Sequence, residues 1–290
     1  MPDKPDITIF EVGPRDGLQN EAQHVGLNDR LKLVELLIDS GLKAIEVGSF
    51  VSPKAVPQMA DTEALIDLLP RPEGVRYSTL VPNLKGMEKA MQAQVHEVAI
   101  FASASQSFSQ HNIACSIEES FERFAPVMAK AKAVNMPVRG YLSCAFGCPY
   151  EGEIAVDAVV MVARKLIELG CYEVAVSDTI GIATPQTTQV VMRSVIDEIG
   201  AAVAAAHFHD THARALDNIK ACLELDVTTF DSAVAGLGGC PYAPGATGNV
   251  ATESVVDMLA KLGLRTGVDI AKVNVAAAYI SKVLKPSSAL

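Results

Sequence analysis

The chain has 290 residues, of which 49% are hydrophobic, and it carries a formal net charge of −10. This length is normal for one β/α barrel, and the apolar fraction is ample for a large core. Such an acidic chain is a poor candidate for binding a phosphate backbone, so the composition argues against a nucleic acid partner.

The cysteines and the first residues indicate the compartment. Six cysteines occur without any CxxC pair, which is typical of reduced thiols in a cytosol-like environment. The first six residues, MPDKPD, form neither an apolar signal core nor a transit pattern. No apolar run reaches the roughly 20 residues that cross a bilayer. We therefore expect a cytoplasmic protein that does not enter a membrane.

Short β-rich segments alternate with longer helical patterns along the chain. Strands are predicted at residues 7–12, 44–47, 75–80, 95–101, 138–144, 172–176, 204–209 and 227–233. Several are apolar on both faces, as expected of parallel strands that helices cover. Helices are predicted at residues 28–40, 116–134, 156–169, 184–199, 213–225 and 250–262, with a last one at about 268–284.

Eight strand-then-helix units predict an α/β fold, a (β/α)8 TIM barrel with an extra C-terminal helix. The main alternative is an open doubly wound sheet. Such a sheet favours a GxGxxG turn after the first strand, and the sequence has none there. No linker or low-complexity tract divides the chain, so we predict a single domain over residues 1–290.

Two charged residues follow the first predicted strand, and a third lies in the second strand. Arg15 and Asp16 stand among two glycines and a proline, which make a tight turn. Glu46 lies within a barrel strand, where a charge is costly unless it is paired, and Arg15 is the obvious partner. Taken alone, this pair is equally compatible with a structural ion pair.

The seventh predicted strand ends with His207 and His209. Residues two apart in a strand point to the same side, so both imidazoles should project together into the barrel mouth, where catalytic groups of such barrels lie. Together with Asp16 and Asn249 they offer two oxygen and two nitrogen donors. This set leaves open positions on an octahedral ion and suits Mg²⁺ or Mn²⁺, with zinc or cobalt as substitutes.

The segment 236–249 after the eighth strand contains five glycines around Cys240. It is compatible with a flexible connection or a phosphate-binding turn, and also with a mobile lid that carries a reactive thiol. Asp178 ends the sixth strand, where it would orient a ligand or a water molecule. Cys144 and Cys148 are predicted to be buried packing residues, because a free cysteine behaves as a small apolar side chain.

Seven segments, spread over nearly the whole chain, carry a resemblance to a known family. They are EVGPRDGLQNE from Glu11, IEVGSFVSPK from Ile45, SIEESFERF from Ser116, RGYLSCAFGCPYEG from Arg139, SDTIG from Ser177, HDT from His209 and AGLGGCPYAPGATGN from Ala235. The chain resembles the 3-hydroxy-3-methylglutaryl-CoA lyase family of the DRE-TIM metallolyase superfamily. The cysteine-containing segment is the most specific, because synthases and aldolases of the superfamily usually lack it.

The resemblance implies a metal-dependent lyase that cleaves 3-hydroxy-3-methylglutaryl-CoA to acetyl-CoA and acetoacetate, as in leucine breakdown and ketone-body formation. It implies that the divalent metal ion is held by four residues, namely Asp16, His207, His209 and Asn249. It also implies an acyl-CoA thioester as substrate and a homodimer. The segment 212–214 reads His-Ala-Arg where Tyr-Gly-Gln is more usual, and Ala22 stands where a basic residue is common.

The resemblance also implies roles in catalysis. Arg15 would stabilise the thioester enolate, and Glu46 would hold Arg15 in place. The base would be His207 or a water molecule held by Asp178. Cys240 would protonate the enolate carbon.

Three alternatives remain open at this stage. The first is a condensing synthase of the same superfamily, similar to isopropylmalate synthase, although such enzymes usually carry an extra C-terminal region. The second is a lyase for a longer branched 3-hydroxyglutaryl-CoA. The third is a non-catalytic barrel that only binds metal or phosphate.

Overall fold

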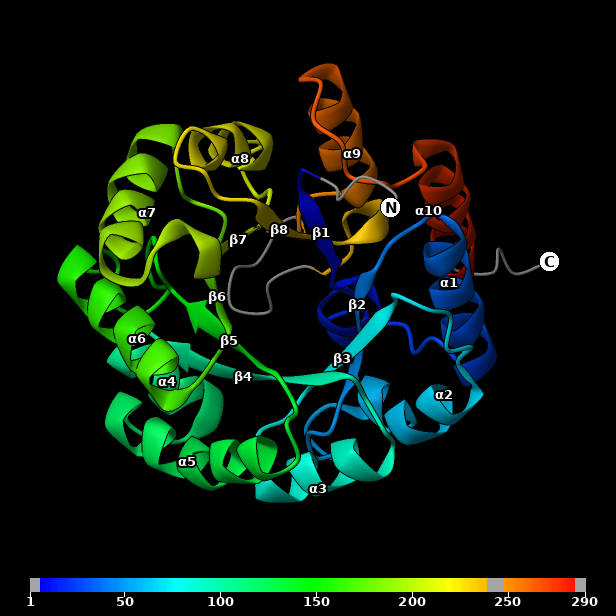
Figure 1. The fold of residues 1–290 in the computed structure, drawn as a ribbon, viewed down its shortest axis with the longest axis horizontal. Helices are drawn as coiled ribbons and strands as arrows, with labels where there is room; N and C mark the ends of the chain where they lie inside the picture. Colours follow the sequence, from blue (N-terminus) through cyan, green and yellow to red (C-terminus); the bar gives the residue numbers. More distant parts are fainter. Residues whose placement is uncertain (1–5, 239–247, 285–290) are drawn as a thin grey trace.

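The computed structural model describes residues 6–238 and 248–284 of the chain. Eight parallel strands form a closed barrel in sequence order, in which the last strand pairs with the first. Helices surround the strands as an outer ring (Figure 1). The predicted TIM barrel is therefore confirmed, and the open doubly wound sheet was the wrong alternative.

Each strand lies within or close to its predicted range. The strands are β1 (Thr8–Glu11), β2 (Ala44–Ser49), β3 (Arg76–Leu80), β4 (Glu97–Ser103), β5 (Val138–Ser143), β6 (Glu173–Asp178), β7 (Ala204–Phe208) and β8 (Thr229–Ser232). Most of their residues are buried, because the helices cover the outside of the barrel and side chains fill the inside.

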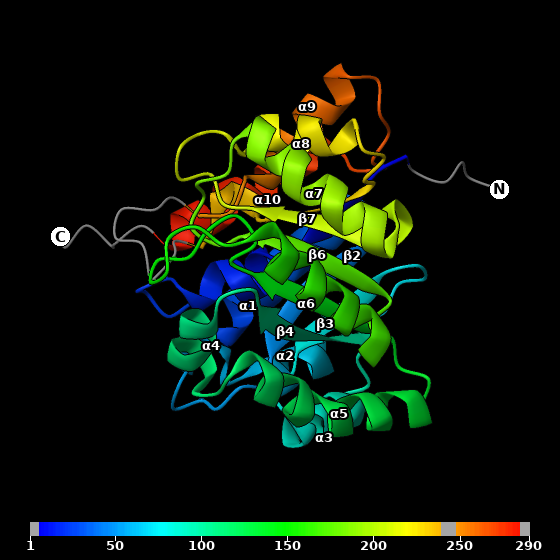
Figure 2. The same ribbon diagram turned by 90° about the vertical axis from the view of Figure 1, so that its left-hand side faces the viewer.

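The helices include three that the sequence analysis did not predict. In chain order they are α1 (Leu27–Asp39), α2 (Thr62–Leu68), α3 (Leu84–Gln92), α4 (Gln106–Ile113), α5 (Ile117–Ala133), α6 (Val156–Leu169), α7 (Pro185–Ile199), α8 (Ala215–Leu223), α9 (Thr252–Lys261) and α10 (Ile270–Val283). The missed helices α2, α3 and α4 have only seven to nine residues, fewer than the window of roughly 11–18 residues over which a helical period is read. Figure 2 shows α5, α6 and α7 side by side on the outside of the barrel.

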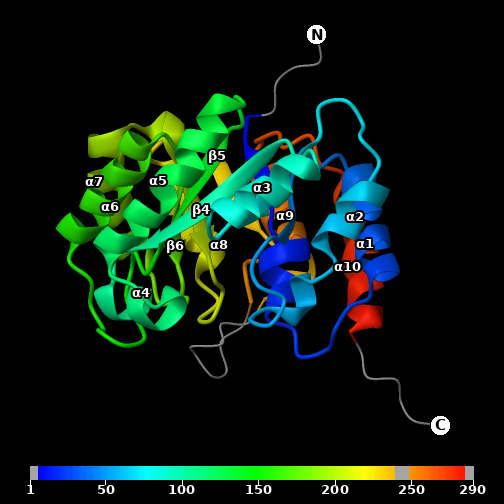
Figure 3. The ribbon, with the colours of Figure 1, turned by 90° about the horizontal axis from the view of Figure 1, so that it is seen from below.

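The predicted extra helix is α10, which follows the eighth unit and packs against α1 (Figures 1 and 3). The Tyr279 hydroxyl on α10 donates a hydrogen bond of 2.6 Å to Asp29 on α1. This contact joins the two ends of the helix ring. No helix among the described residues combines the length and the apolar character that crossing a membrane requires.

The apolar core has two parts of different character. The larger part fills the space between the strands and the helices. The smaller part draws one residue from each of five neighbouring strands: Leu80, Ala99, Tyr141, Ala175 and Ala205. Three of these five side chains are alanines, which leaves room within the barrel for the long charged side chains described below.

A buried carboxyl group, that of Glu11, connects the beginning of the barrel to its end. Glu11 Oε1 accepts hydrogen bonds from the backbone N–H groups of Gly13 (2.8 Å) and Val234 (2.9 Å), while Oε2 accepts one from the Thr252 hydroxyl (2.6 Å). A Cβ at Gly13 would lie 2.6 Å from Glu11 Oε1, so this turn requires glycine. Burial raises the pKa of Glu11 to about 7, although its three donors oppose the shift.

The raised pKa makes stability depend on pH. Because the folded-state pKa lies above that of unfolded glutamate, the contribution of Glu11 is complete below about pH 4.5 and is lost as the pH rises through about 7. Glu11→Gln keeps a neutral side chain of the same shape and removes this dependence. Between pH 5.5 and 8.5 the free energy of unfolding of wild type should therefore fall by about 2 kcal/mol relative to that of the variant.

Urea denaturation at the two pH values, with EDTA present, measures this difference. Glu63→Gln is the matched control, since Glu63 is an exposed glutamate on α2. Parallel pH dependences for wild type and Glu11→Gln would contradict the prediction.

Candidate active site

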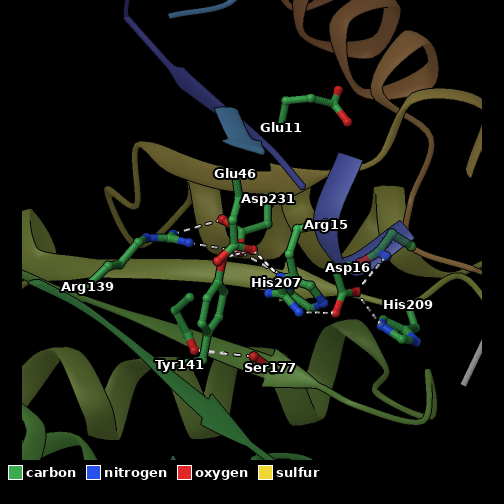
Figure 4. A network of polar contacts seen from close by, with 12 residues as sticks. Glu11, Arg15, Asp16, Glu46, Arg139, Tyr141, Ser177, His207, His209 and Asp231 are labelled. Carbon is green, nitrogen blue, oxygen red and sulfur yellow. Dashed lines mark hydrogen bonds and ion pairs between the residues drawn. The ribbon is translucent and has the colours of Figure 1, made fainter. Parts of the chain in front are cut away.

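Four of the predicted site residues come from three places at one mouth of the barrel, and Figure 4 shows three of them, Asp16, His207 and His209. Asp16 lies in η1 (Gly13–Gly17), a π-helical turn that follows β1. His207 is the next-to-last residue of β7, and His209 follows the strand. Asn249 forms an isolated antiparallel β-bridge with His209. The carboxyl ends of β1 and β7 therefore place these side chains together, as the sequence predicted.

Asp16, His207 and His209 form a compact cluster of metal-binding atoms. One ligand atom of each lies within 4.8 Å of those of the others, and His209 Nε2 lies 4.0 Å from Asp16 Oδ2. The prediction that both imidazoles project together is confirmed. Burial and, to a smaller extent, the neighbouring His207 lower the pKa of His209 to about 4, although Asp16 opposes the shift. His209 is therefore neutral at pH 7, the form in which imidazole binds metal ions.

Asn249 completes this cluster. Its Nδ2 donates hydrogen bonds to Asp16 Oδ2 (2.9 Å) and to the carbonyl of Leu237 (3.0 Å). Its Oδ1 and the Nδ1 of His209 are buried, and neither has a hydrogen-bond partner in the described part of the chain. Leaving such a group unpaired costs about 1–3 kcal/mol. A carboxylate, two imidazoles and an amide with unpaired buried atoms fit a divalent cation.

The loop after β8 approaches η1 so closely that glycine is required on both sides. A Cβ at Gly17 would lie 2.7 Å from Leu237 Cβ, and a Cβ at Gly238 would lie 2.9 Å from Asn249 Nδ2. Gly238 also has a φ of +99°, which side chains disfavour. Two glycines thus allow the backbone that carries Asp16 to lie against the backbone that leads to Asn249.

Arg15 is fixed between two carboxylates. Its Nε donates to Glu46 Oε2 at 2.5 Å, and its Nη1 donates to Asp16 Oδ1 at 2.6 Å. The Tyr141 hydroxyl donates to the same Glu46 oxygen at 3.1 Å. The predicted Arg15–Glu46 pair is confirmed. Burial alone would lower the pKa of Arg15, but Glu46 and Asp16 outweigh it and raise that pKa, so the guanidinium stays charged.

Arg15 also affects its neighbour Asp16. Burial alone would raise the pKa of Asp16, but Arg15 and the two histidines hold it well below its usual range. Asp16 is therefore an ionised carboxylate at neutral pH, as a metal ligand should be.

Two buried charged residues that the sequence analysis did not select lie behind His207. Asp231 Oδ2 lies 3.0 Å from His207 Nδ1. Arg139 donates to both oxygens of Asp231, at 2.8 and 3.0 Å. The signal was present in the sequence, because Asp231 is a charge within a predicted strand, as Glu46 is.

Asp178 lies at the end of β6, as predicted, and its carboxylate organises the loop that follows. The backbone N–H groups of Ile182 and Ala183 donate to its two oxygens at 3.0 and 2.9 Å. Burial raises the pKa of Asp178 to about 6 despite these donors. Each oxygen keeps a second acceptor position, so holding a water molecule remains a prediction for this residue.

The cysteine predictions divide into two groups. Cys240 lies in the segment 239–247, outside the described residues, so its role stays a prediction. Cys144 and Cys148 are both buried, as predicted. They pack with Phe108 in a small cluster, and Cys148 Sγ lies 2.9 Å from Ser105 Oγ.

Comparison with known sequences finds similarity over almost the whole chain. The HMGL-like family model matches residues 6–280. Hydroxymethylglutaryl-CoA lyase of Pseudomonas mevalonii is 52% identical over 264 residues, which cover 91% of this chain and 88% of that relative. A Pseudomonas aeruginosa relative, 3-hydroxy-3-isohexenylglutaryl-CoA/hydroxy-methylglutaryl-CoA lyase, is also 52% identical, over 91% of this chain and 88% of its own length.

Comparison with solved structures finds lyases of the same name. The crystal structure of hydroxymethylglutaryl-CoA lyase from Pseudomonas aeruginosa has a TM-score of 0.95 and 50% identity, covering 97% of this chain and 94% of that one. An HMG-CoA lyase from Acinetobacter baumannii, in complex with coenzyme A and 3-methylmalate, has a TM-score of 0.92 and 34% identity. That match covers 98% of this chain and 93% of the other.

Binding of a metal ion by Asp16, His207, His209 and Asn249, here called the four-donor cluster, predicts a change in the thermal stability of the protein. A ligand at 100 times its dissociation constant stabilises the folded state by about 2.7 kcal/mol. Adding Mn²⁺ to EDTA-treated protein should therefore raise its Tm by roughly 5 °C. His209→Ala removes one donor and should lose most of this shift, whereas His24→Ala, at an exposed histidine, should keep it. A full shift in His209→Ala, measured by differential scanning fluorimetry, would place the ion elsewhere.

Proposed function

The chain belongs to the HMGL-like family, and we propose that it is a metal-dependent carbon–carbon lyase that cleaves 3-hydroxy-3-methylglutaryl-CoA to acetyl-CoA and acetoacetate. One observation carries the proposal. A fixed guanidinium, that of Arg15, contacts the same carboxylate that lies in the four-donor cluster, Asp16. Stabilisation of an enolate and activation of a hydroxyl group can therefore occur side by side.

The residues proposed to hold the cation are Asp16, His207, His209 and Asn249, with Mg²⁺ or Mn²⁺ as the ion. When bound, such an ion acts as a Lewis acid that lowers the pKa of the substrate's C3 hydroxyl group. The buried Oδ1 of Asn249, which has no hydrogen-bond partner among the described residues, supports this assignment.

Arg15 is proposed to stabilise the enolate oxygen of the thioester that forms when the C2–C3 bond breaks. Glu46 fixes its Nε and Asp16 fixes one terminal nitrogen, so the guanidinium needs little reorganisation during the reaction. A preorganised donor of this kind is typically worth ~3–4 kcal/mol. Cys240 is proposed to protonate the enolate carbon and so complete acetyl-CoA.

The proton of the C3 hydroxyl group needs an acceptor, for which the sequence offered His207 or a water molecule held by Asp178. His207 Nδ1 already contacts Asp231, so a metal ion on its other ring nitrogen leaves His207 no free position. The geometry therefore favours Asp178 with a water molecule. The pKa of Asp178, about 6, suits a proton acceptor that works near neutral pH.

The substrate partner is proposed to be an acyl-CoA thioester, which the Acinetobacter baumannii relative with bound coenzyme A supports. The net charge of −10 means that an anionic ligand must be held by local donors. A homodimer is proposed from the resemblance, and a cytoplasmic location from the six cysteines without a CxxC pair.

A second candidate substrate is a longer branched 3-hydroxyglutaryl-CoA. The relative that acts on the isohexenyl compound is as similar to this chain as the Pseudomonas mevalonii lyase is. In addition, His212 of the atypical segment 212–214 lines a cavity of about 470 Å³ that Asn249 also lines. The departure from the family pattern therefore lies next to a proposed metal ligand.

The two substrates can be compared directly in one assay. We expect acetoacetate from 3-hydroxy-3-methylglutaryl-CoA, loss of this activity in EDTA, and its recovery with Mg²⁺ or Mn²⁺. A higher kcat/KM for the isohexenyl thioester would favour the second candidate. Release of free thiol from acetyl-CoA and a 2-oxo acid, without lyase activity, would instead indicate a condensing synthase.

Arg15→Lys tests the proposed enolate stabilisation. Lysine keeps the charge but carries all of its donors on one nitrogen, so it lacks the rigid planar pair of donors, Nε and Nη1, with which Arg15 contacts Glu46 and Asp16. We expect kcat to fall by roughly 10²–10³-fold, with Mn²⁺ affinity changed far less. Arg193→Lys, at an exposed arginine on α7, is the control and should retain full activity. Near-normal kcat in Arg15→Lys would remove Arg15 from the chemical step.

A further inference from the structure

We propose that Asp231 and Arg139 are positioning residues for His207, and that they determine which ring nitrogen of His207 is available to the metal ion. This inference rests on the proposed function, because the metal site belongs to it. The contacts in Figure 4 run from Arg139 through Asp231 to His207. These residues come from β5, β8 and β7, respectively.

Asp231 determines where the proton of the His207 ring lies. Asp231 Oδ2 lies 3.0 Å from Nδ1, and an ionised carboxylate can only accept a hydrogen bond. Nδ1 must therefore carry the proton. In the neutral ring this leaves the lone pair on Nε2, which is the nitrogen that can bind a cation. A carboxylate behind a metal-binding histidine acts in this way in many metal sites.

Arg139 in turn fixes the carboxylate of Asp231. Arg139 donates one hydrogen bond to each oxygen of Asp231, and the side chains of both residues are completely buried. Asp231 therefore has neither solvent nor a second orientation available. A bidentate contact with a guanidinium keeps it ionised and fixes its plane.

Arg139 is itself held in place by further contacts. Its Nε donates to Glu173 Oε1 at 2.7 Å, and its guanidinium lies 4.1 Å from the centre of the Phe10 ring. Phe10 on β1 is in register with Asp231 on β8. Arg139 is thus held by Glu173, Asp231 and the Phe10 ring. Through Asp231 it fixes the orientation of the His207 ring.

A purely structural ion pair would make a different prediction from a positioning pair, and Asp231→Asn separates them. An amide offers only one acceptor oxygen, which Arg139 would recruit. The NH₂ group would then face His207 Nδ1 and require that atom to accept. The proton would move to Nε2 and block the cation. In Asp231→Asn the affinity for the metal ion should therefore fall strongly, whereas the stability of the fold should fall much less.

The experiment measures the tautomer and the metal affinity separately on the full chain. Long-range ¹H–¹⁵N correlation spectra of metal-free protein labelled with ¹⁵N-histidine report which nitrogen of His207 is protonated. We expect protonated Nδ1 in wild type and protonated Nε2 in Asp231→Asn. Titration with Mn²⁺, followed by electron paramagnetic resonance, should give an affinity for Asp231→Asn that is about 10–100-fold weaker.

Glu173→Gln is the matched control. It alters Arg139 from the side away from His207, so it should lower thermal stability but change Mn²⁺ affinity less than about 3-fold, well below the effect expected at Asp231. Unprotonated Nδ1 in wild type would overturn the inference, and so would unchanged Mn²⁺ affinity in a folded Asp231→Asn. The wild-type spectrum decides the question even if that variant fails to fold.

The two proposals can fail independently. If wild type binds no Mn²⁺, the proposed function fails, while the wild-type spectrum still tests how Asp231 orients His207. If wild type binds Mn²⁺ and has lyase activity but Nδ1 is unprotonated, only the positioning inference fails.

Discussion

Closure of the barrel between β8 and β1 brings the first and last strands together, and the candidate site depends on it. The pairing of Phe10 with Asp231 and of Glu11 with Ser232 fixes the position along the barrel axis at which the chain leaves β1 and enters the turn η1. Asp16 can then meet Asn249, which lies more than 230 residues later in the chain. Glu11 secures this closure, because its carboxyl group binds backbone from both sides of the seam. A shift in register would separate the donors even if each one were retained.

The same closed wall excludes water from its interior, so every charge inside it has to be paired. Arg15 lies between Glu46 and Asp16, and Arg139 lies between Asp231 and Glu173. Each guanidinium is shared by two carboxylates that come from different elements. Such pairs contribute little net stability, because desolvation offsets their attraction, but they give the side chains one fixed arrangement. At the mouth where chemistry is proposed to occur, these buried pairs therefore fix the geometry of the side chains without adding much stability.

The sequence predicted those features that depend on local rules. The strand period of two places His207 and His209 on one side, and a charge within a strand requires a partner, as at Glu46. It did not predict that Arg139 reaches Asp231, because that contact joins β5 to β8 and depends on register and strand tilt. The short helices α2 to α4 were missed because each is shorter than the window of roughly 11–18 residues over which a helical period is read. The role of Cys240 and the single-domain assignment remain predictions.

Charge balance in the barrel agrees with the proposed divalent cation. The connected network contains the carboxylates of Asp16, Glu46, Asp231 and Glu173 and the guanidinium groups of Arg15 and Arg139. With all four carboxylates ionised and both imidazoles neutral, the state in which imidazole binds a metal ion, the carboxylates exceed the guanidinium groups by two charges. An uncompensated charge of this size is costly away from water. An ion of charge +2 between Asp16 and the two histidines would balance the network, whereas a monovalent ion would leave it negative.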